Sequence, residues 1–365
     1  MGLSNMTEAQ SDRNVHFETG LDESATDVVS FESDEKTLLE KVHHWLHKTP
    51  AAVPLIVLLA SIALFGVLLG SKFFSPFALT LILQQVQIVG ILAAAQTLVI
   101  LTAGIDLSVG AIAVLCSVIM GQFTFRYGLP PVASIACGLA AGTLIGALNG
   151  WLVARPKLPP FIVTLGTWQI VLAATYIYSA NETIRSQDVE ANAPFLQFFG
   201  TKFNLGGASI TLGVVAMCLL VFILAYVLKH TAWGRHVYAV GDDPEAAELA
   251  GVQVGRTLIS VYALAGLICA LAGWVMIGRF GSVSPSLSTG QIGNIQAITA
   301  VVIGGISLFG GRGSILGAFF GALIVGVFEL GLRMAGADAQ WTYLLIGILI
   351  ISAVAVDQWI RKVAG

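Results

Sequence analysis

The chain has 365 residues, of which 56% are hydrophobic and only 11% are charged. A soluble domain is about one quarter charged, so this composition excludes an ordinary soluble protein and indicates several membrane-spanning segments. The formal net charge of −3 gives no indication of nucleic-acid binding. The cysteines form no CxxC pair, so we interpret all four as small buried side chains: Cys116, Cys137, Cys218 and Cys269.

Residues 1–48 are predicted to form an acidic cytoplasmic tail. They contain ten acidic and four basic residues, and residues 1–36 lack the apolar periodicity that a folded segment needs, as is typical of disorder. No basic start is followed by an apolar core, so we do not interpret the tail as a signal peptide. The HHWLH stretch lacks further metal ligands nearby. We therefore predict that this stretch is an interfacial segment that leads into the first span, with Trp45 at the level of the lipid headgroups.

Apolar runs in residues 49–365 predict a transmembrane domain of about ten helices. We expect an all-α polytopic membrane protein, because β-barrel alternation is absent and helices satisfy their own backbone hydrogen bonds in lipid. With a cytoplasmic N-terminus, twelve of the eighteen Lys and Arg residues lie on the inner side, which favours both termini in the cytoplasm. The runs are 53–70, 78–103, 109–125, 132–153, 161–179, 209–228, 257–278, 292–309, 314–333 and 341–356.

A lone acid follows the second run, in LTAGIDLSVGAIAVL (residues 101–115). A carboxylate is costly in hydrocarbon and indicates a functional site by default. Asp106 lies 29 residues after Phe77, and a helix of that length would span about 44 Å, more than the ~30 Å of hydrocarbon. We therefore predict a turn on the cytoplasmic side, where Asp106 or Ser108 caps the next helix. The alternative is a broken helix in which Asp106 lines a pathway at depth.

Glycine spacing predicts close contacts between helices. Residues four apart share a helix face, and glycine there lets a second helix approach closely. Two triplets have this spacing: Gly142, Gly146 and Gly150, and Gly313, Gly317 and Gly321. The stretch AGIDLSVGAIAVL (103–115) also resembles GGISLFGGRGSIL (304–316), which raises the possibility of an internal repeat of the kind common in transporters.

The stretch 229–256, KHTAWGRHVYAVGDDPEAAELAGVQVGR, is the longest polar interruption on the inner side. Asp242 can cap a helix, Pro244 suits its first turn, and Glu245 stands three residues after Asp242 as in a capping box. Gly251 would end this helix. We predict a two-turn helix exposed to the cytosol, with a slim surface at Glu245, Ala246 and Ala247. Composition alone favours a solvated connector.

The segment GDDPEAAELAGVQV resembles the coupling loop of permease subunits in binding-protein-dependent ABC importers. Three further stretches are similar to signatures of the same family and occur in the same order: LTAGIDLSVGAI, LPPFIVTLGT (158–167) and AVVIGGISLFGGRGSILG (300–317). The chain is therefore identified as a member of the monosaccharide permease branch, which includes ribose, xylose, arabinose and fructose systems. SANETIRSQD, RHVYAVGDD and VAVDQWIRKV resemble the fructose subgroup.

The resemblance implies a subunit of the bacterial inner membrane that works as a homodimer or with a paired permease. It implies cytosolic ATP-binding subunits that use ATP, a periplasmic sugar-binding protein, and no cofactor bound by this chain. The sequence lacks a GxxxxGK[ST] phosphate loop, and we interpret FGGRGS (309–314) as a tight turn. The implied contact with the ATPase comprises Gly241, Asp242, Asp243, Pro244, Glu245, Ala246, Ala247 and Gly251.

Monosaccharides are neutral and rich in hydroxyls, so a pathway for them should present amides, hydroxyls and aromatic rings. For each candidate a hydrogen bond between helices is an equally good explanation. The candidates are Gln84, Gln85, Gln87, Gln96, Asn149, Thr164, Thr167, Trp168, Asn294 and Gln296. The segment 180–208, expected to be external, would be either a docking surface for the binding protein or a solvated loop; the residues that would serve such a surface are Glu182, Arg185, Asp188 and Glu190.

Two other classes of protein compete with this interpretation. A proton-coupled secondary transporter would use Asp106 as its proton carrier. A membrane-embedded enzyme is not indicated, because HExxH, GxSxG and paired acids are absent from the apolar runs, so we expect neither catalytic residues nor a metal site. Within the ABC class, the substrate could also be another pentose or hexose, a nucleoside or a branched-chain amino acid.

Overall fold

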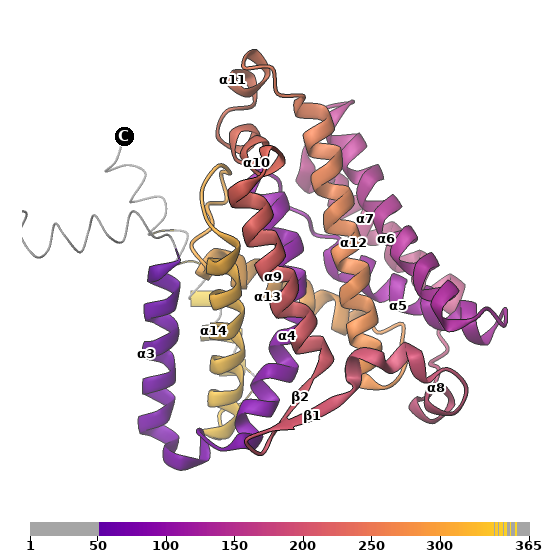
Figure 1. The fold of residues 1–365 in the computed structure, drawn as a ribbon, viewed down its shortest axis with the longest axis vertical. Helices are drawn as coiled ribbons and strands as arrows, with labels where there is room; N and C mark the ends of the chain where they lie inside the picture. Colours follow the sequence, from indigo (N-terminus) through magenta and orange to yellow (C-terminus); the bar gives the residue numbers. More distant parts are fainter. Residues whose placement is uncertain are drawn as a thin grey trace, which may run out of the picture. The chain divides into compact units, whose positions relative to one another are not determined.

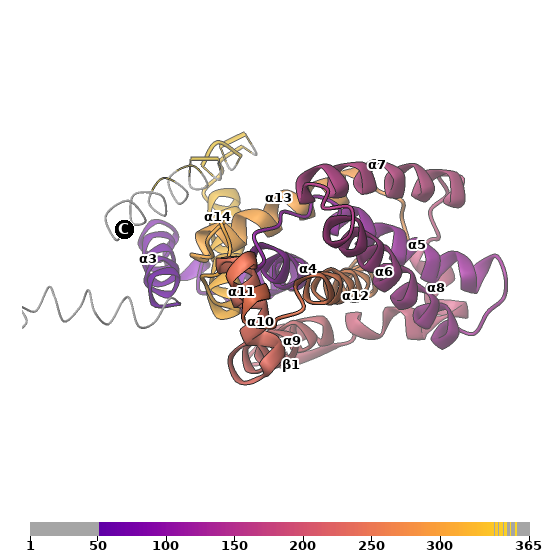
Figure 2. The same ribbon diagram turned by 90° about the horizontal axis from the view of Figure 1, so that it is seen from above.

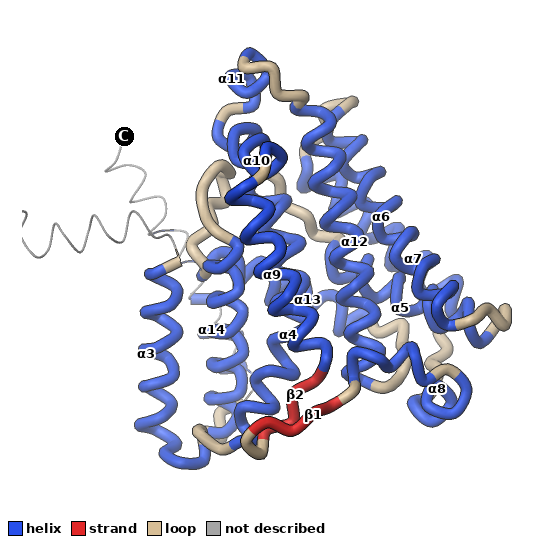
Figure 3. The backbone as a smooth tube through the Cα atoms, viewed as in Figure 1, coloured by secondary structure: helices blue, strands red, loops and turns tan. Residues whose placement is uncertain are grey.

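The computed structural model describes residues 51–338 and scattered positions between 340 and 355. The predicted acidic tail and most of the predicted run 341–356 lie outside the described residues. The described part is mostly helical (Figures 1 and 3). Seven of its helices are long and apolar enough to cross a membrane: α3 (Ala52–Leu69), α4 (Pro76–Leu101), α6 (Pro131–Ala154), α7 (Pro160–Ser179), α9 (Leu212–His230), α12 (Val254–Phe280) and α14 (Ile315–Met334).

Two shorter helices occupy two further predicted runs, α5 (Val109–Phe125) and α13 (Leu287–Ile303). For α13 the predicted bounds of 292–309 are wrong. The helix starts earlier because the side chain of Ser286 accepts a hydrogen bond from the amide of Thr289, as an N-cap does. It ends at Ile303 because Gly305 adopts a left-handed conformation with φ of 73°, which favours glycine.

The most extensive contact between two helices joins α6 to α12, which lie side by side (Figure 2). A Cβ atom at Gly142 would lie 2.6 Å from the carbonyl oxygen of Gly266, and one at Gly146 would overlap the carbonyl oxygen of Tyr262. The predicted glycine contact is therefore confirmed for this triplet. In the second triplet, Gly317 and Gly321 face the backbone of α13 in the same way, whereas Gly313 lies in the turn before α14.

The all-α prediction is wrong for the segment between α7 and α9. This segment contains α8 (Ser186–Asn192), the 3-10 helix η2 (Pro194–Gly200), and an antiparallel hairpin of β1 (Lys202–Leu205) and β2 (Ala208–Thr211). The hairpin forms because Gly206 and Gly207 both have positive φ, as its two-residue turn requires. A second 3-10 helix, η1 (Gly70–Lys72), joins α3 to α4.

The bundle has two ends that carry different elements. The hairpin leads directly into α9 at Leu212, and α9 leads at His230 into α10 (Ala232–Asp242) and α11 (Pro244–Leu249). The hairpin and α8 therefore lie at one end of the bundle, which we call the hairpin end, and α10 and α11 lie at the other, the α11 end (Figure 1).

Candidate functional site

The short helix α11 is held by caps at both of its ends. The side chain of Asp243 accepts hydrogen bonds from the amides of Glu245 and Ala246 at 2.9 and 3.0 Å. The expected cap at Asp242 is wrong, because α10 continues through Asp242 and leaves only Asp243 in extended backbone. After the helix, Gly251 has φ of 85° and donates its amide hydrogen to the carbonyl of Glu248.

The exposed surface of α11 differs from the predicted one. Ala247 is only 5% exposed, and the chain after the helix folds back so that the amide of Val252 donates to the carbonyl of Ala247. Leu249 is 91% exposed. From the sequence we did not select Leu249. This residue follows Ala246 by three positions and Glu245 by four, so it lies on the same face of the helix as both. The exposed apolar residue at the tip of this segment is therefore Leu249.

Three backbone segments meet beneath α11 at what we call the glycine junction: Leu101–Ala103, Gly241 and Gly310–Gly311. The amide of Gly311 donates to the carbonyl of Leu101 at 3.0 Å. A Cβ atom at Gly241 would overlap that carbonyl oxygen and lie 2.7 Å from the Gly311 nitrogen. The side chain of Tyr238 in α10 also donates to the carbonyl of Gly313 at 2.9 Å. The end of α10 is thus packed directly onto the end of α4.

The turn between α4 and α5 holds Asp106 in the interior, where its side chain is 2% exposed. Its Oδ1 atom accepts hydrogen bonds from the amide of Ser108 at 2.7 Å and from its hydroxyl at 2.5 Å. Burial raises the pKa of the Asp106 carboxyl, and the two bonds from Ser108 oppose that rise. Ser108 occupies the N-cap position of α5 without a capping bond from its own side chain.

Four predicted pathway residues converge on this turn from four helices. Thr164 accepts from the amide of Leu107 at 3.1 Å and donates to the carbonyl of Ile105 at 3.0 Å. Asn294 accepts from the amide of Gly110 at 2.7 Å and donates to the carbonyl of Leu107. These contacts hold the backbone of the turn on two sides.

The other two residues at the turn, Gln96 and Asn149, are fully buried. Asn149 donates to the hydroxyl of Ser108 at 3.1 Å and accepts from Thr167 at 2.6 Å. The amide of Gln96, with its nitrogen towards the Asp106 carbonyl, bonds both backbone groups of Asp106. Because each of the four residues bonds the turn, we interpret them as the framework that fixes it.

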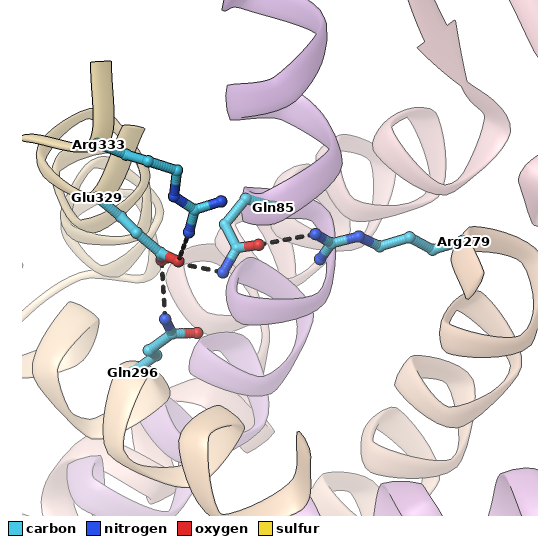
Figure 4. A network of polar contacts seen from close by, with 5 residues as sticks. All are labelled: Gln85, Arg279, Gln296, Glu329 and Arg333. Carbon is cyan, nitrogen blue, oxygen red and sulfur yellow. Dashed lines mark hydrogen bonds and ion pairs between the residues drawn. The ribbon is translucent and has the colours of Figure 1, made fainter. Parts of the chain in front are cut away.

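Figure 4 shows a second polar network, which involves the last turns of α12 and α14 and therefore lies nearer the hairpin end. Glu329 in α14 accepts from Gln85 in α4 and Gln296 in α13, both at 3.0 Å. It also forms an ion pair with Arg333 at 2.9 Å. Gln85 in turn accepts from Arg279 at 2.7 Å. From the sequence we selected Gln85 and Gln296 but missed Glu329. A signal was present, because Glu329 is a lone acid within an apolar run, just as Asp106 is a lone acid between two apolar runs.

Another candidate, Gln87, takes no part in the hydrogen bonds of either network. Gln87 accepts from the hydroxyl of Thr211 at 2.7 Å and donates to the carbonyl of Gln84, so it joins α4 to the hairpin end. The four charged residues selected in segment 180–208 are all exposed: Glu182, Arg185, Asp188 and Glu190. In the part of the chain that the structure describes, no group of three His, Cys, Asp or Glu side chains could hold a metal ion.

Seven candidate membrane spans, intramembrane polar networks and a capped helix beyond the spans are features of a polytopic membrane transport protein. The family model described as the permease component of branched-chain amino acid transport systems matches residues 78–354. The chain belongs to this permease family. It is therefore a multi-pass protein of the bacterial inner membrane, as predicted.

Curated relatives show a graded similarity. The chain is 70% identical to the fructose import permease protein FrcC of Rhizobium meliloti, over 100% of both chains. It is 35% identical to the ribose import permease protein RbsC of Escherichia coli strain K12, over 86% of this chain and 94% of the relative. It is 34% identical to the autoinducer 2 import system permease protein LsrD of Escherichia coli strain SMS-3-5, over 73% of this chain and 79% of the relative. No solved structure matches the chain.

Proposed function

We propose that this chain is the transmembrane subunit of a binding-protein-dependent ABC importer for a monosaccharide, and that the monosaccharide is fructose. The observation that carries the proposal is the 70% identity, along the whole chain, to a fructose import permease. The ribose permeases are about half as similar. Another pentose or hexose, a nucleoside or a branched-chain amino acid is the alternative substrate, the last because of the family's description.

The proposed assembly has two copies of this chain, or one copy and a paired permease, around the pathway. Residues 49–365 would form the permease domain, with residues 1–48 as a cytoplasmic tail and both termini inside. Separate cytosolic subunits would bind and hydrolyse ATP, so this chain would need no cofactor. A periplasmic sugar-binding protein would deliver the substrate at the hairpin end, where the exposed charges of α8 and its flanks would face it.

The coupling contact would be α11. Its rigidity supports this role, because caps hold both of its ends and Leu249 projects an apolar side chain that a groove on an ATPase could take up. The glycine junction supplies the rest of the path, since it joins α10 to the end of α4 without intervening side chains. A movement of α11 would reach the turn at Asp106 through backbone contacts alone.

The competing proton-coupled transporter requires an acid that a proton can reach. Asp106 is 2% exposed, and Ser108 occupies its Oδ1 with two hydrogen bonds. This enclosure favours a structural carboxylate over a proton carrier. The decisive experiment measures sugar uptake by proteoliposomes that contain the permease, its ATPase and its binding protein. Uptake that requires internal ATP and survives a protonophore supports the proposal, whereas the reverse pattern overturns it.

A further inference from the structure

The network around Glu329 lies in the half of the bundle nearer the hairpin end, the end at which the proposed binding protein would deliver a sugar. It draws side chains from α4, α12, α13 and α14. Arg279 lies in the last turn of α12, which begins just after α11, so Arg279 is far from α11. The helix α14 begins after the loop at the glycine junction, so Glu329 and Arg333 also lie away from the α11 end. Figure 4 shows the side chains converging from these helices.

Glu329 is the only acidic residue in the nine described helices α3 to α7, α9 and α12 to α14. Its side chain is 18% exposed, whereas that of Arg333 is 71% exposed. An acid in a membrane helix is costly to insert and is therefore a functional-site hypothesis by default. Amide side chains alone could link these helices by hydrogen bonds at a lower free-energy cost of insertion, so the presence of a carboxylate needs an explanation.

The network around Glu329 keeps unused hydrogen-bonding capacity. The guanidinium of Arg279 has five N–H groups, and among the described residues one hydrogen bond is found for it, to Gln85. The same guanidinium lies over the ring of Phe280, 5.1 Å from its centre. The carbonyl oxygen of Gln296 has no donor among the described side chains, since its nitrogen makes the bond to Glu329.

This mixture of groups fits a neutral ligand that carries several hydroxyls. Each hydroxyl can donate and accept at once, and the network alternates acceptors on Glu329 and Gln296 with donors on Arg279. Phe280 is 50% exposed and offers a flat apolar face beside them, suited to the C–H face of a sugar ring. A site of this kind has few polar groups set in apolar surroundings, as small-molecule sites do.

We propose that Glu329, Gln296, Gln85 and Arg279 form the contact point for sugar hydroxyls in the half of the pathway nearer the hairpin end. The inference rests on the proposed function and adds the residues that touch the substrate. Among the candidates found from sequence, Gln96, Asn149, Thr164 and Asn294 therefore fix a turn, whereas Gln85 and Gln296 belong to the pathway.

The test uses the complete importer in proteoliposomes, with fructose as the probe, and measures both imported fructose and hydrolysed ATP. The variants are Glu329→Gln, Gln296→Leu and Arg279→Lys. Fructose imported per ATP should fall about tenfold in each, because a hydrogen bond to a charged or buried partner is lost. Hydrolysis stimulated by the loaded binding protein should persist, because α11 and the glycine junction are untouched. Gln122→Leu, on α5 and outside the network, should match the unchanged importer.

The outcomes separate the two proposals. If the unchanged importer takes up no fructose with ATP, the substrate assignment of the proposed function fails. If the unchanged importer does take up fructose with ATP, and the variants import as much fructose per ATP as the unchanged importer, only the proposed hydroxyl site is overturned. A parallel fall of import and hydrolysis, with their ratio unchanged, also overturns the site and indicates a clasp between helices. Should Glu329→Gln fail to assemble, Gln296→Leu and Arg279→Lys decide, because both keep the carboxylate beside Arg333.

Discussion

The amide of Gly311 donates a hydrogen bond to the carbonyl oxygen of Leu101, and this bond ties the loop before α14 to the last turn of α4. Gly241 from α10 lies against the same carbonyl. Three segments that are separated by many residues in the sequence thus share one small volume. The contact is made by backbone atoms, so it transmits displacement without the rotamer freedom that side chains would add.

Gly241→Ala should damage coupling. The added Cβ would overlap the Leu101 carbonyl, and overpacking of this kind costs about 1–3 kcal/mol. The expected result is a lower midpoint of thermal unfolding and a reduced rate of sugar-stimulated ATP hydrolysis by the assembled importer. Gly166→Ala is the matched control, because nothing lies within 4 Å of its added atom. Equal behaviour of the two variants would show that the glycine junction tolerates a side chain.

Asp106→Asn should transport at close to the normal rate. The amide oxygen of Asn can accept the same bonds from Ser108 that Oδ1 accepts now. Asp106→Ala loses both bonds and should be less stable by about 1–3 kcal/mol, because the buried Ser108 groups are left unpaired. Sugar uptake by both variants tests the expected transport rate, and thermal unfolding of both variants tests the expected stability. A folded but inactive Asn variant would instead favour an acid with a direct role in transport.

Leu249→Glu should separate the permease from its ATPase. The side chain is exposed at the tip of α11, and a charge placed in an apolar contact would be desolvated without a partner. Co-purification of the two subunits from detergent should fall, whereas the amount of permease in the membrane should not change. Glu248→Gln, on the same helix and also exposed, is the control and should co-purify normally. Retention of the ATPase by Leu249→Glu would place the coupling contact elsewhere.

Gly146→Val should disrupt the contact between α6 and α12. A side chain there would push against the Tyr262 carbonyl, and the neighbouring Gly142 and Gly150 face α12 in the same way. Because small residues are what lets these two backbones approach, the expected result is a large loss of folded permease, measured by size-exclusion chromatography in detergent. Gly255→Val is the comparison, since the nearest atom to its Cβ is 3.9 Å away.

Composition and periodicity predict the helices well because lipid imposes both the length and the apolarity of a span. The turn at Asp106 follows from length alone, since α4 is too long to continue. The burial of that turn does not follow, because it depends on Thr164 and Asn294 reaching it from α7 and α13. Gln85 and Gln296 were found by residue type, and Glu329 could have been found as a lone acid in an apolar run, but that Glu329 bonds both amides is visible only in the structure.

The two errors in the predicted structure of α11 each arise from a neighbouring segment of the chain. A capping box at Asp242 and a cap at Asp243 are both compatible with the sequence, and the choice depends on how far α10 extends. The burial of Ala247 depends on the return of the chain after Gly251. Neither length nor periodicity carries that information, so the exposed tip at Leu249 becomes visible only in the structure.

The length of α12 has a mechanical consequence. Its 27 residues run without interruption from the connection after α11 to Arg279 and Phe280, a rod of about 40 Å. Such a rod is a lever arm: a tilt of about 5° about one end would move the other by about 3.5 Å over that length. A displacement of this size exceeds the 2.7 Å between Arg279 and Gln85, so a modest push at the α11 end would be enough to break or make that bond at the far end of the helix.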